Sequence, residues 1–290
     1  MSTLTVVSYA NRETSGSRNL RQSLELHNYD YKFLGEGEKW EGFMTKINAY
    51  LRFVTNADPE ELVVLVDAYD VLAVGGPDEL LRKWNSRLDK RPILFSSEIN
   101  SGINNCTPLN AYWGDVQRPT NSFLNSGFIM GQAKDLKIAL QYAVDSHEKD
   151  DQYAMCKFAD RHPDVVELDT ENNIIGTMLY DVFKYGWNND TRRITYGDKT
   201  PVFIHIPADH VDFGLRMIYF GSRLLGQQFE EVRTVERLRI FVAKWSYGTV
   251  VIILTLISVA IYFFPRVTMI TLLMLVIIVF FARWIVTKRT

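Results

Sequence analysis

The most constraining feature of the sequence is an apolar run that ends in two carboxylates. Residues 62–66 are all leucine or valine, and Asp67 and Asp70 follow three positions apart. A short apolar run without polar alternation is typical of a strand covered on both faces, as in α/β proteins. Such sheets bind ligands just beyond the carboxyl ends of their strands. We therefore predict an α/β fold with both aspartates at the ligand-binding edge.

Two carboxylates at positions i and i+3 after a strand admit two interpretations. A sharp turn would bring Asp67 and Asp70 to the same side, where they repel each other unless a cation lies between them. A divalent ion such as Mg²⁺ or Mn²⁺ takes oxygen ligands and leaves positions open for phosphates. Alternatively, both aspartates cap a turn, and an isolated motif of this length does not decide between the two.

Strand-like and helix-like segments alternate along most of the chain. The first strand is expected at the N-terminus and ends near Ser8, and the alternation continues to about residue 205. This order predicts a mostly parallel sheet with covering helices. The expected helices are 18–27, 44–57, 80–88, 136–147 and 151–159, and the later strands are 31–34, 62–66, 93–98 and 202–205.

Two further segments are expected to bring polar residues to the same edge of the sheet. The apolar strand 93–98 ends in Glu98, and a strand-like segment with two glycines carries Asn125. Glycine inside a strand indicates a bulge or a close approach of backbone to a ligand. We therefore expect Asn125 to project into the site.

Three other polar residues have ordinary structural interpretations when each is considered alone. Asp150 and Asp151 stand at a helix start, where acids commonly act as caps, so the residues alone favour a structural role. His205 ends an apolar strand, where a lone histidine is more often hydrogen-bonded than a ligand.

In the polar loop 100–119, Tyr112 and Trp113 either stack on a sugar or base or pack the loop onto the core.

The chain is nearly neutral as a whole but asymmetric. Its formal net charge is −2, yet from residue 233 onward eight basic residues and one acidic residue give +7, which leaves −9 for the rest. The acidic part can bury a sizeable core, and its sign argues against nucleic acid as a partner. The two cysteines, Cys106 and Cys156, are expected to be free thiols, typical of a reducing compartment.

Six blocks of sequence in a fixed order give the chain its resemblance to a known family. The blocks are GEGEKW at 35–40, VDAYDV at 66–71, LFSSE at 94–98, FLNSG at 123–127, DDQ at 150–152 and PVFIH at 201–205. Over about the first 210 residues the chain resembles the glycosyltransferase domain of the procollagen lysyl hydroxylase (PLOD) family. That family has a GT-A fold, which is Rossmann-like, and transfers sugars from UDP-sugar donors with Mn²⁺.

The resemblance implies three groups of site residues. The metal ligands, for Mn²⁺ or Mg²⁺, are Asp67, Asp70 and His205. The donor-binding residues are Ser8, Lys46, Asp67 and Tyr69, with the Tyr69 ring stacking on the uracil. The residues on the sugar and acceptor side, which include the candidate catalytic groups, are Glu98, Asn125, Asp150 and Asp151.

The expected activity is metal-assisted transfer of a hexose or pentose from a UDP-sugar to a hydroxyl of a glycan or protein acceptor. After His205 the family continues with glycine-asparagine-glycine, whereas this chain has IPADH at 206–210, so the donor sugar stays open. Because this sequence has no hydroxylase domain, collagen is not the expected acceptor. Two alternatives are a metal-dependent nucleotidyltransferase and a non-catalytic membrane scaffold of the same fold.

The C-terminal region contains two apolar segments, 247–264 and 267–286, separated by Pro265 and Arg266. As helices they would be about 27 Å and about 30 Å long, enough for a hydrocarbon core of about 30 Å. We therefore expect a transmembrane hairpin. The expected organisation is a GT-A domain at 1–213, an amphipathic linker helix at 214–245, which suits either a lipid surface or a simple linker, and the hairpin at 246–290.

Basic residues flank this hairpin on both sides and predict its orientation. Four basic residues precede it from Arg233 onward, and Lys288 and Arg289 follow it, while the loop between the segments has only Arg266. Positive residues stay on the cytoplasmic side. The chain is thus expected to be an integral membrane protein whose catalytic domain faces the cytoplasm, in agreement with an N-terminus that has no secretory signal.

Overall fold

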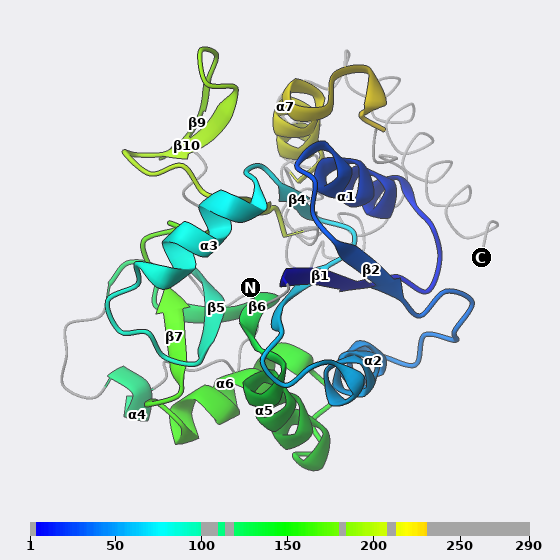
Figure 1. The fold of residues 1–290 in the computed structure, drawn as a ribbon, viewed down its shortest axis with the longest axis vertical. Helices are drawn as coiled ribbons and strands as arrows, with labels where there is room; N and C mark the ends of the chain where they lie inside the picture. Colours follow the sequence, from blue (N-terminus) through cyan, green and yellow to red (C-terminus); the bar gives the residue numbers. More distant parts are fainter. Residues whose placement is uncertain (1–3, 100–109, 114–118, 180–183, 208–212, 231–290) are drawn as a thin grey trace, which may run out of the picture. The chain divides into compact units, whose positions relative to one another are not determined.

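The computed structural model of the chain describes residues 4–99, 110–113, 119–179, 184–207 and 213–230. Helices and strands alternate through these ranges (Figure 1). The helices are α1 (Ser15–Leu26), α2 (Phe43–Asn56), α3 (Pro77–Asn85), α4 (Asn110–Trp113), α5 (Ala133–Asp145), α6 (Asp151–Arg161), α7 (Phe213–Leu225) and the 3₁₀ helix η2 (Gly226–Gln228). The strands are β1 (Leu4–Tyr9), β2 (Tyr31–Leu34), β3 (Leu62–Asp67), β4 (Val71–Ala73), β5 (Ile93–Glu98), β6 (Phe123–Gln132), β7 (Val166–Asp169), β8 (Ile175–Thr177), β9 (Tyr185–Asn188), β10 (Arg193–Tyr196) and β11 (Phe203–His205).

The main sheet has six strands in the order β2-β1-β3-β6-β5-β7. The pairs β1/β2, β1/β3 and β5/β7 are parallel, whereas β6 runs antiparallel to both β3 and β5. The prediction of a mostly parallel α/β sheet is therefore confirmed. Because β6 is reversed, its first residues meet the carboxyl ends of β3 and β5 at one edge, where Asp67, Asn125 and Glu98 lie.

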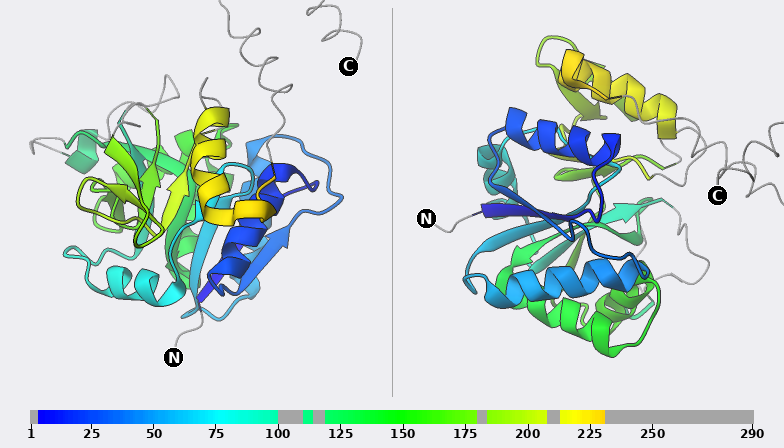
Figure 2. Two further views of the ribbon diagram at one scale, coloured as in Figure 1. Left: turned by 90° about the horizontal axis from the view of Figure 1, so that it is seen from above. Right: turned by 90° about the vertical axis from the view of Figure 1, so that its right-hand side faces the viewer.

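Helices cover both faces of the main sheet (Figure 2). Val63 and Leu65 pack on one face with residues of α2, α5 and α6, and Val64 and Val66 pack on the other with residues of α1 and α3. Successive strand side chains point to opposite faces, so both sets are buried. Each such side chain stabilises the fold by about 1.5–3 kcal/mol relative to exposure. Burial on both faces explains why the run lacks polar alternation.

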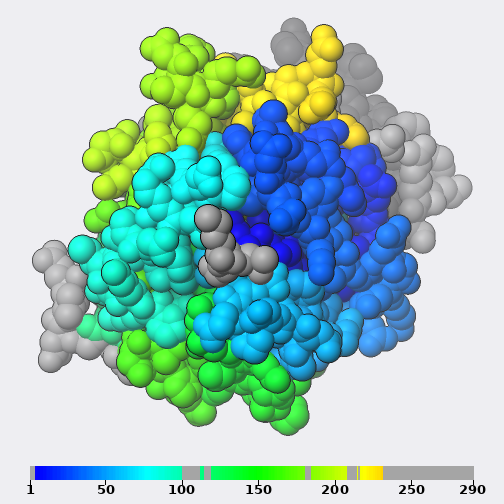
Figure 3. All heavy atoms as spheres, in the orientation of Figure 1, coloured from blue at the N-terminus to red at the C-terminus, as the bar shows by residue number. Residues whose placement is uncertain are grey.

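A second sheet has three strands in the order β4-β11-β8. It places β11, which is late in the chain, beside β4, which directly follows Asp70. β11 is antiparallel to β4 and parallel to β8, with His205 opposite Val71 and Thr177. The β9-β10 hairpin projects from the surface beside α3 (Figures 1 and 3), where Arg193 Nη1 lies 2.6 Å from Glu79 Oε2 of α3.

The helix expected over 214–245 is shorter than predicted. α7 ends at Leu225, and Gly226 follows with φ +58°, a left-handed conformation that favours glycine and ends helices. Its apolar residues Met217 and Phe220 are buried with Ile204 of the small sheet. Met217 and Phe220 pack within the unit of residues 1–232, whereas Ile218 and Tyr219 of the same helix are exposed.

The expected membrane hairpin, 247–264 and 267–286, lies outside the described residues and stays a prediction. Within the ranges that the structure describes, none of the helices has the length and apolar character needed to cross a bilayer.

The cysteine prediction is wrong for Cys156. This residue of α6 is 4% exposed and is disulfide-bonded, whereas Cys106 lies outside the described residues. Disulfides form and persist in oxidising environments. The cysteines therefore give no support to a reducing compartment.

Candidate functional site

The three residues expected to bind a metal come together in the structure. Asp67 ends β3, Asp70 directly precedes β4, and His205 ends β11. One ligand atom from each residue lies within 4.8 Å of the others. His205 Nε2 and Asp70 Oδ2 are 3.3 Å apart. The pairing of β11 with β4 is what sets the histidine beside the second acid.

The turn that carries the second acid is held from two sides. The Ile206 N–H donates to the Asp70 carbonyl over 2.8 Å. On the other side, Gly16 in the first turn of α1 packs so closely that a Cβ there would lie 2.4 Å from the Tyr69 carbonyl oxygen. The half-buried Tyr69 donates its hydroxyl to Asn11 Oδ1 over 3.3 Å. The aromatic residue thus lies at the sheet edge beside the acids, and its stacking on a base stays a prediction.

The donor set fits a hard divalent ion. Mg²⁺ holds its oxygen ligands at about 2.1 Å, so two ligands at right angles lie about 3 Å apart. The separation of 3.3 Å between His205 Nε2 and Asp70 Oδ2 is close to that value. Burial by itself would lower the pKa of His205, but the neighbouring Asp70 carboxylate raises that pKa above its usual value. A compact set of two carboxylates and an imidazole therefore favours a cation site over a turn cap.

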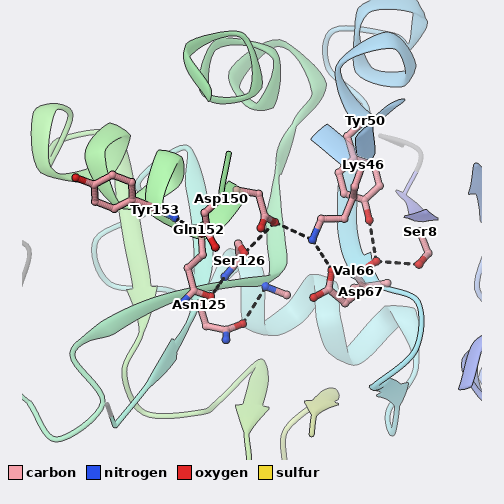
Figure 4. Close-up of polar contacts among 12 residues, drawn as sticks. Ser8, Lys46, Tyr50, Val66, Asp67, Asn125, Ser126, Asp150, Gln152 and Tyr153 are labelled. Atoms are coloured by element: carbon pink, nitrogen blue, oxygen red, sulfur yellow. Dashed lines mark hydrogen bonds and ion pairs between the residues drawn. The ribbon is translucent and has the colours of Figure 1, made fainter. Parts of the chain in front are cut away.

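Lys46 joins the first acid to the start of α6. Its Nζ lies 2.6 Å from Asp67 Oδ1 (Figure 4) and 2.8 Å from Asp151 Oδ2. Lys46 is 7% exposed. Burial would lower the pKa of Lys46, but the carboxylates of Asp151 and Asp67 together raise it well above its usual value. The ammonium therefore stays charged and ties the metal-site acid to a buried second carboxylate.

The two neighbouring acids at the start of α6 have different roles. Asp150 is the N-cap, and its Oδ1 accepts the Tyr153 N–H over 2.8 Å, as the capping prediction stated. Asp151 is 4% exposed, and its Oδ2 also accepts the Ser126 hydroxyl over 3.1 Å. Burial, and then the nearby Asp151 carboxylate, raise the pKa of the half-buried Asp150. Asp151 is thus ion-paired, whereas Asp150 is the more exposed acid.

Glu98 and Asn125 reach the site as predicted but are enclosed. They are 3% and 5% exposed. Glu98 Oε2 accepts Asn125 Nδ2–H over 2.9 Å, and Glu98 Oε1 accepts Gln152 Nε2–H over 3.1 Å. Asn125 Oδ1 lies 3.0 Å from His205 Nδ1. Both side chains therefore lie on the Nδ1 side of the His205 ring, opposite Asp70. Gln152 was not singled out as a site residue, although it belongs to the DDQ block.

The expected donor contact of Ser8 does not fit its position. Ser8 is 1% exposed and donates its hydroxyl to the Val66 carbonyl over 2.8 Å. The Tyr50 hydroxyl donates to the same carbonyl over 2.9 Å. Ser8 thus fixes the strand one residue before Asp67. Tyr50 was missed, although its spacing of four residues from Lys46 puts both on one face of a helix.

The aromatic pair of the long loop packs against the protein. Tyr112 and Trp113 form part of α4 and contact the core beneath α6. Trp113 Nε1–H donates to the Ser122 carbonyl over 3.1 Å. These contacts favour the packing interpretation over stacking on a ligand. The loop residues on either side, 100–109 and 114–118, lie outside the described ranges.

Comparisons with known proteins agree with this fold. The family model described as the PLOD GT domain matches residues 1–206. Fold and this match place the chain in the class of proteins with a glycosyltransferase-type domain. The chain belongs to the family of PLOD glycosyltransferase domains.

Relatives share this part of the chain. An uncharacterized protein of Acanthamoeba polyphaga mimivirus is 27% identical over 215 residues, which are 67% of this chain and 43% of that protein. Procollagen-lysine,2-oxoglutarate 5-dioxygenase 1 of Gallus gallus is 31% identical over 220 residues, 70% of this chain and 30% of the relative. The chain thus spans less than half the length of these relatives. A solved glycosyltransferase involved in glycosylation of the major capsid of PBCV-1 is 10% identical, with a TM-score of 0.47, over 74% of this chain and 98% of that one.

Proposed function

We propose that this protein transfers a sugar from a UDP-sugar to an acceptor hydroxyl with the help of a divalent ion held by Asp67, Asp70 and His205. The observation that carries the proposal is the convergence of one ligand atom from each residue within 4.8 Å. The bound ion would act as a Lewis acid on the donor diphosphate. The family membership supports the transferase class, and the donor set supports the metal requirement.

The choice of metal follows from the ligand types. Carboxylates suit Mg²⁺ and Mn²⁺, whereas imidazole suits later transition metals. His205 adds one nitrogen to the two carboxylates of Asp67 and Asp70. This mixed set favours Mn²⁺ over Mg²⁺ as the working ion.

Exposure ranks the three acids proposed for the acceptor side. Both Glu98 oxygens accept hydrogen bonds from buried amides, and Asp151 is paired with Lys46. Asp150 is half-buried and uses one oxygen as the helix cap. We therefore assign orientation of the acceptor hydroxyl to Asp150. Lys46 would hold Asp67 toward the donor, and the ring of Tyr69 would stack on the uracil.

One assay separates this function from its alternatives. The full chain is incubated with a panel of UDP-hexoses and UDP-pentoses and Mn²⁺, and release of UDP is followed with and without candidate glycan and protein acceptors. We expect Mn²⁺-dependent UDP release with one donor. Pyrophosphate release from nucleoside triphosphates would identify a nucleotidyltransferase, and the absence of both products would favour a scaffold.

We also propose that residues 246–290 anchor this domain to a bilayer. The proposal is supported by the two apolar segments and their basic flanks. In sealed vesicles, protease added to the cytoplasmic side should remove the N-terminal domain and leave a small protected hairpin. Protection of the whole domain would reverse the orientation and would agree with the disulfide at Cys156.

A further inference from the structure

A buried hydrogen-bonded chain leads from Glu98 through Asn125 to His205. Glu98 Oε2 lies 2.9 Å from Asn125 Nδ2, and Asn125 Oδ1 lies 3.0 Å from His205 Nδ1. All three residues are at most 5% exposed. Gln152 closes the far end, since its Nε2–H donates to the other Glu98 oxygen.

Backbone N–H groups fix the orientation of both amides in this chain. The Gly127 N–H donates to Asn125 Oδ1 over 2.9 Å, and the Ser126 N–H donates to Gln152 Oε1 over 3.2 Å. A backbone N–H can only donate, so each contact identifies an amide oxygen. The NH₂ groups of Asn125 and Gln152 must then face Glu98. A rotation of either amide would lose at least two hydrogen bonds.

The fixed amide determines which nitrogen of His205 carries the proton. Asn125 Oδ1 can only accept, so His205 Nδ1 must be the donor. The other ring nitrogen, Nε2, faces Asp70 Oδ2 at 3.3 Å. When the ring is neutral and its proton is held at Nδ1, the Nε2 lone pair is the one presented to the acids. Metal-binding histidines are commonly held in this way by a partner on the opposite nitrogen.

The space beside the histidine ring is matched to this arrangement. A Cβ at Gly127 would lie 2.4 Å from His205 Cε1 and 2.7 Å from His205 Nδ1. Any side chain at this position would therefore push the ring away from Asn125. Glycine lets one residue supply the N–H that orients the amide and also leave room for the ring.

We propose that Glu98 and Asn125 are positioning residues that hold His205 in the Nδ1–H tautomer and aim Nε2 at the acids. They act through the histidine and not by contact with sugar or acceptor. The proposal rests on the proposed function for its purpose, because a fixed Nε2 lone pair serves a metal site. The tautomer itself is a property of the protein without metal.

The direct test is nitrogen NMR of the full chain with ¹⁵N-labelled histidine. The chain has five histidines, so the His205 signals are assigned by their loss in His205→Gln. At alkaline pH, where the ring is neutral, we expect the proton on Nδ1. A neutral ring with its proton on Nε2 would overturn the proposal, and this result needs no other variant to fold.

A charge-conserving exchange tests the chain of hydrogen bonds. Asn125→Asp alone sets two carboxylates against each other, and Glu98→Gln alone sets amide against amide. The double variant Asn125→Asp/Glu98→Gln restores complementary partners throughout and still offers His205 an acceptor. We expect each single variant to weaken Mn²⁺ binding by about 10- to 100-fold, the usual effect of losing a partner behind a ligand, and the double variant to recover most of it.

The outcomes distinguish this inference from the proposed function. Asn125→Ala should lose the preference for Nδ1–H, and retention of both the tautomer and the Mn²⁺ affinity in a folded Asn125→Ala would refute the positioning role. A wild type that holds Nδ1–H, loses it in Asn125→Ala and yet binds no Mn²⁺ would uphold the inference and defeat the metal-dependent function.

Discussion

Two pairs of acids in this protein look alike in the sequence but differ in the structure. Asp67 and Asp70 flank the end of a strand, and Asp150 and Asp151 open a helix. Both members of the first pair lie beside His205. In the second pair, Asp150 binds the helix backbone, whereas Asp151 binds the buried Lys46. The role of neighbouring carboxylates thus depends on the secondary-structure element that follows them. Substitutions in the two pairs should therefore differ in their effects on metal binding and on stability.

The strand-end pair should be essential for metal binding. Asp70→Asn keeps the size of the side chain but removes a negative ligand, so we expect Mn²⁺ affinity to fall by more than the 10- to 100-fold typical of a partner behind a ligand. Isothermal calorimetry measures the affinity, with the exposed Asp164→Asn as a matched control. Mn²⁺ binding equal to that of the control would contradict the metal assignment.

The helix-start pair should matter most for stability. Asp151→Asn leaves the buried Lys46 with Asp67 as its one carboxylate partner, so we expect the free energy of unfolding to fall by about 1.5–3 kcal/mol, the value of a hydrogen bond to a charged group. Urea unfolding without metal should show this loss, and Lys46→Met/Asp151→Asn should recover part of it. A loss below about 1 kcal/mol, as for a surface pair, would remove the distinction between the two acidic pairs.

Asp67 belongs both to the metal-site residues and to the buried ion pair with Lys46, so its substitution does not separate the two roles. Lys46 Nζ lies 2.6 Å from Asp67 Oδ1, so Asp67→Asn also breaks a contact of the buried lysine. This variant should therefore lose stability as well as metal affinity. Asp70 is the cleaner probe of the metal.

Mn²⁺ binding should also depend on the clearance beside the His205 ring. Gly127→Ala puts a methyl group within 2.4 Å of the ring, so we expect Mn²⁺ affinity to fall by about 10- to 100-fold through a displaced histidine. Gly76→Ala, whose Cβ would lie 3.8 Å from the His27 carbonyl oxygen, is the control. Equal affinities in the two variants would show that the ring has room to move.

The cap should give the smallest effect. Asp150→Ala is expected to cost about 1 kcal/mol, whereas Asp150→Asn keeps the cap. Because the pKa of Asp150 is raised in the folded state, that state binds the proton more tightly, and its stability should fall as pH rises through the raised pKa. Asp150→Asn should remove this fall in pH-dependent thermal unfolding. If turnover also survives in Asp150→Asn, the acceptor role proposed for this residue is wrong.

The sequence predicts the parts of the fold that follow local rules. The strands 31–34 and 93–98 have the predicted bounds, and Asp150 caps α6 as its position predicts. In contrast, β7 to β10 are three or four residues long and lack sustained periodicity, so they were not predicted. The early stop of α7 at Gly226 depends on a backbone conformation that a helical pattern does not reveal.

The candidate site was predictable as a set of residues but not as a network. The strand ends indicated Asp67 and Glu98, because parallel strands deliver their last residues to one edge. The pairing of Lys46 with Asp151 depends on how α2 and α6 pack, and the contact of Asn125 with His205 depends on the reversal of β6. Such long-range contacts follow from topology, which residue spacing along the chain does not encode.

The position of β11 late in the sequence has a consequence for the nascent chain. Ribosomal synthesis proceeds from the N-terminus, so β4 is made long before the strand that pairs with it. Until residues 203–206 emerge, neither His205 nor the N–H that holds the Asp70 carbonyl is present. An unfinished chain therefore carries the two acids without their third partner, and the site becomes complete only when nearly the whole domain has been made.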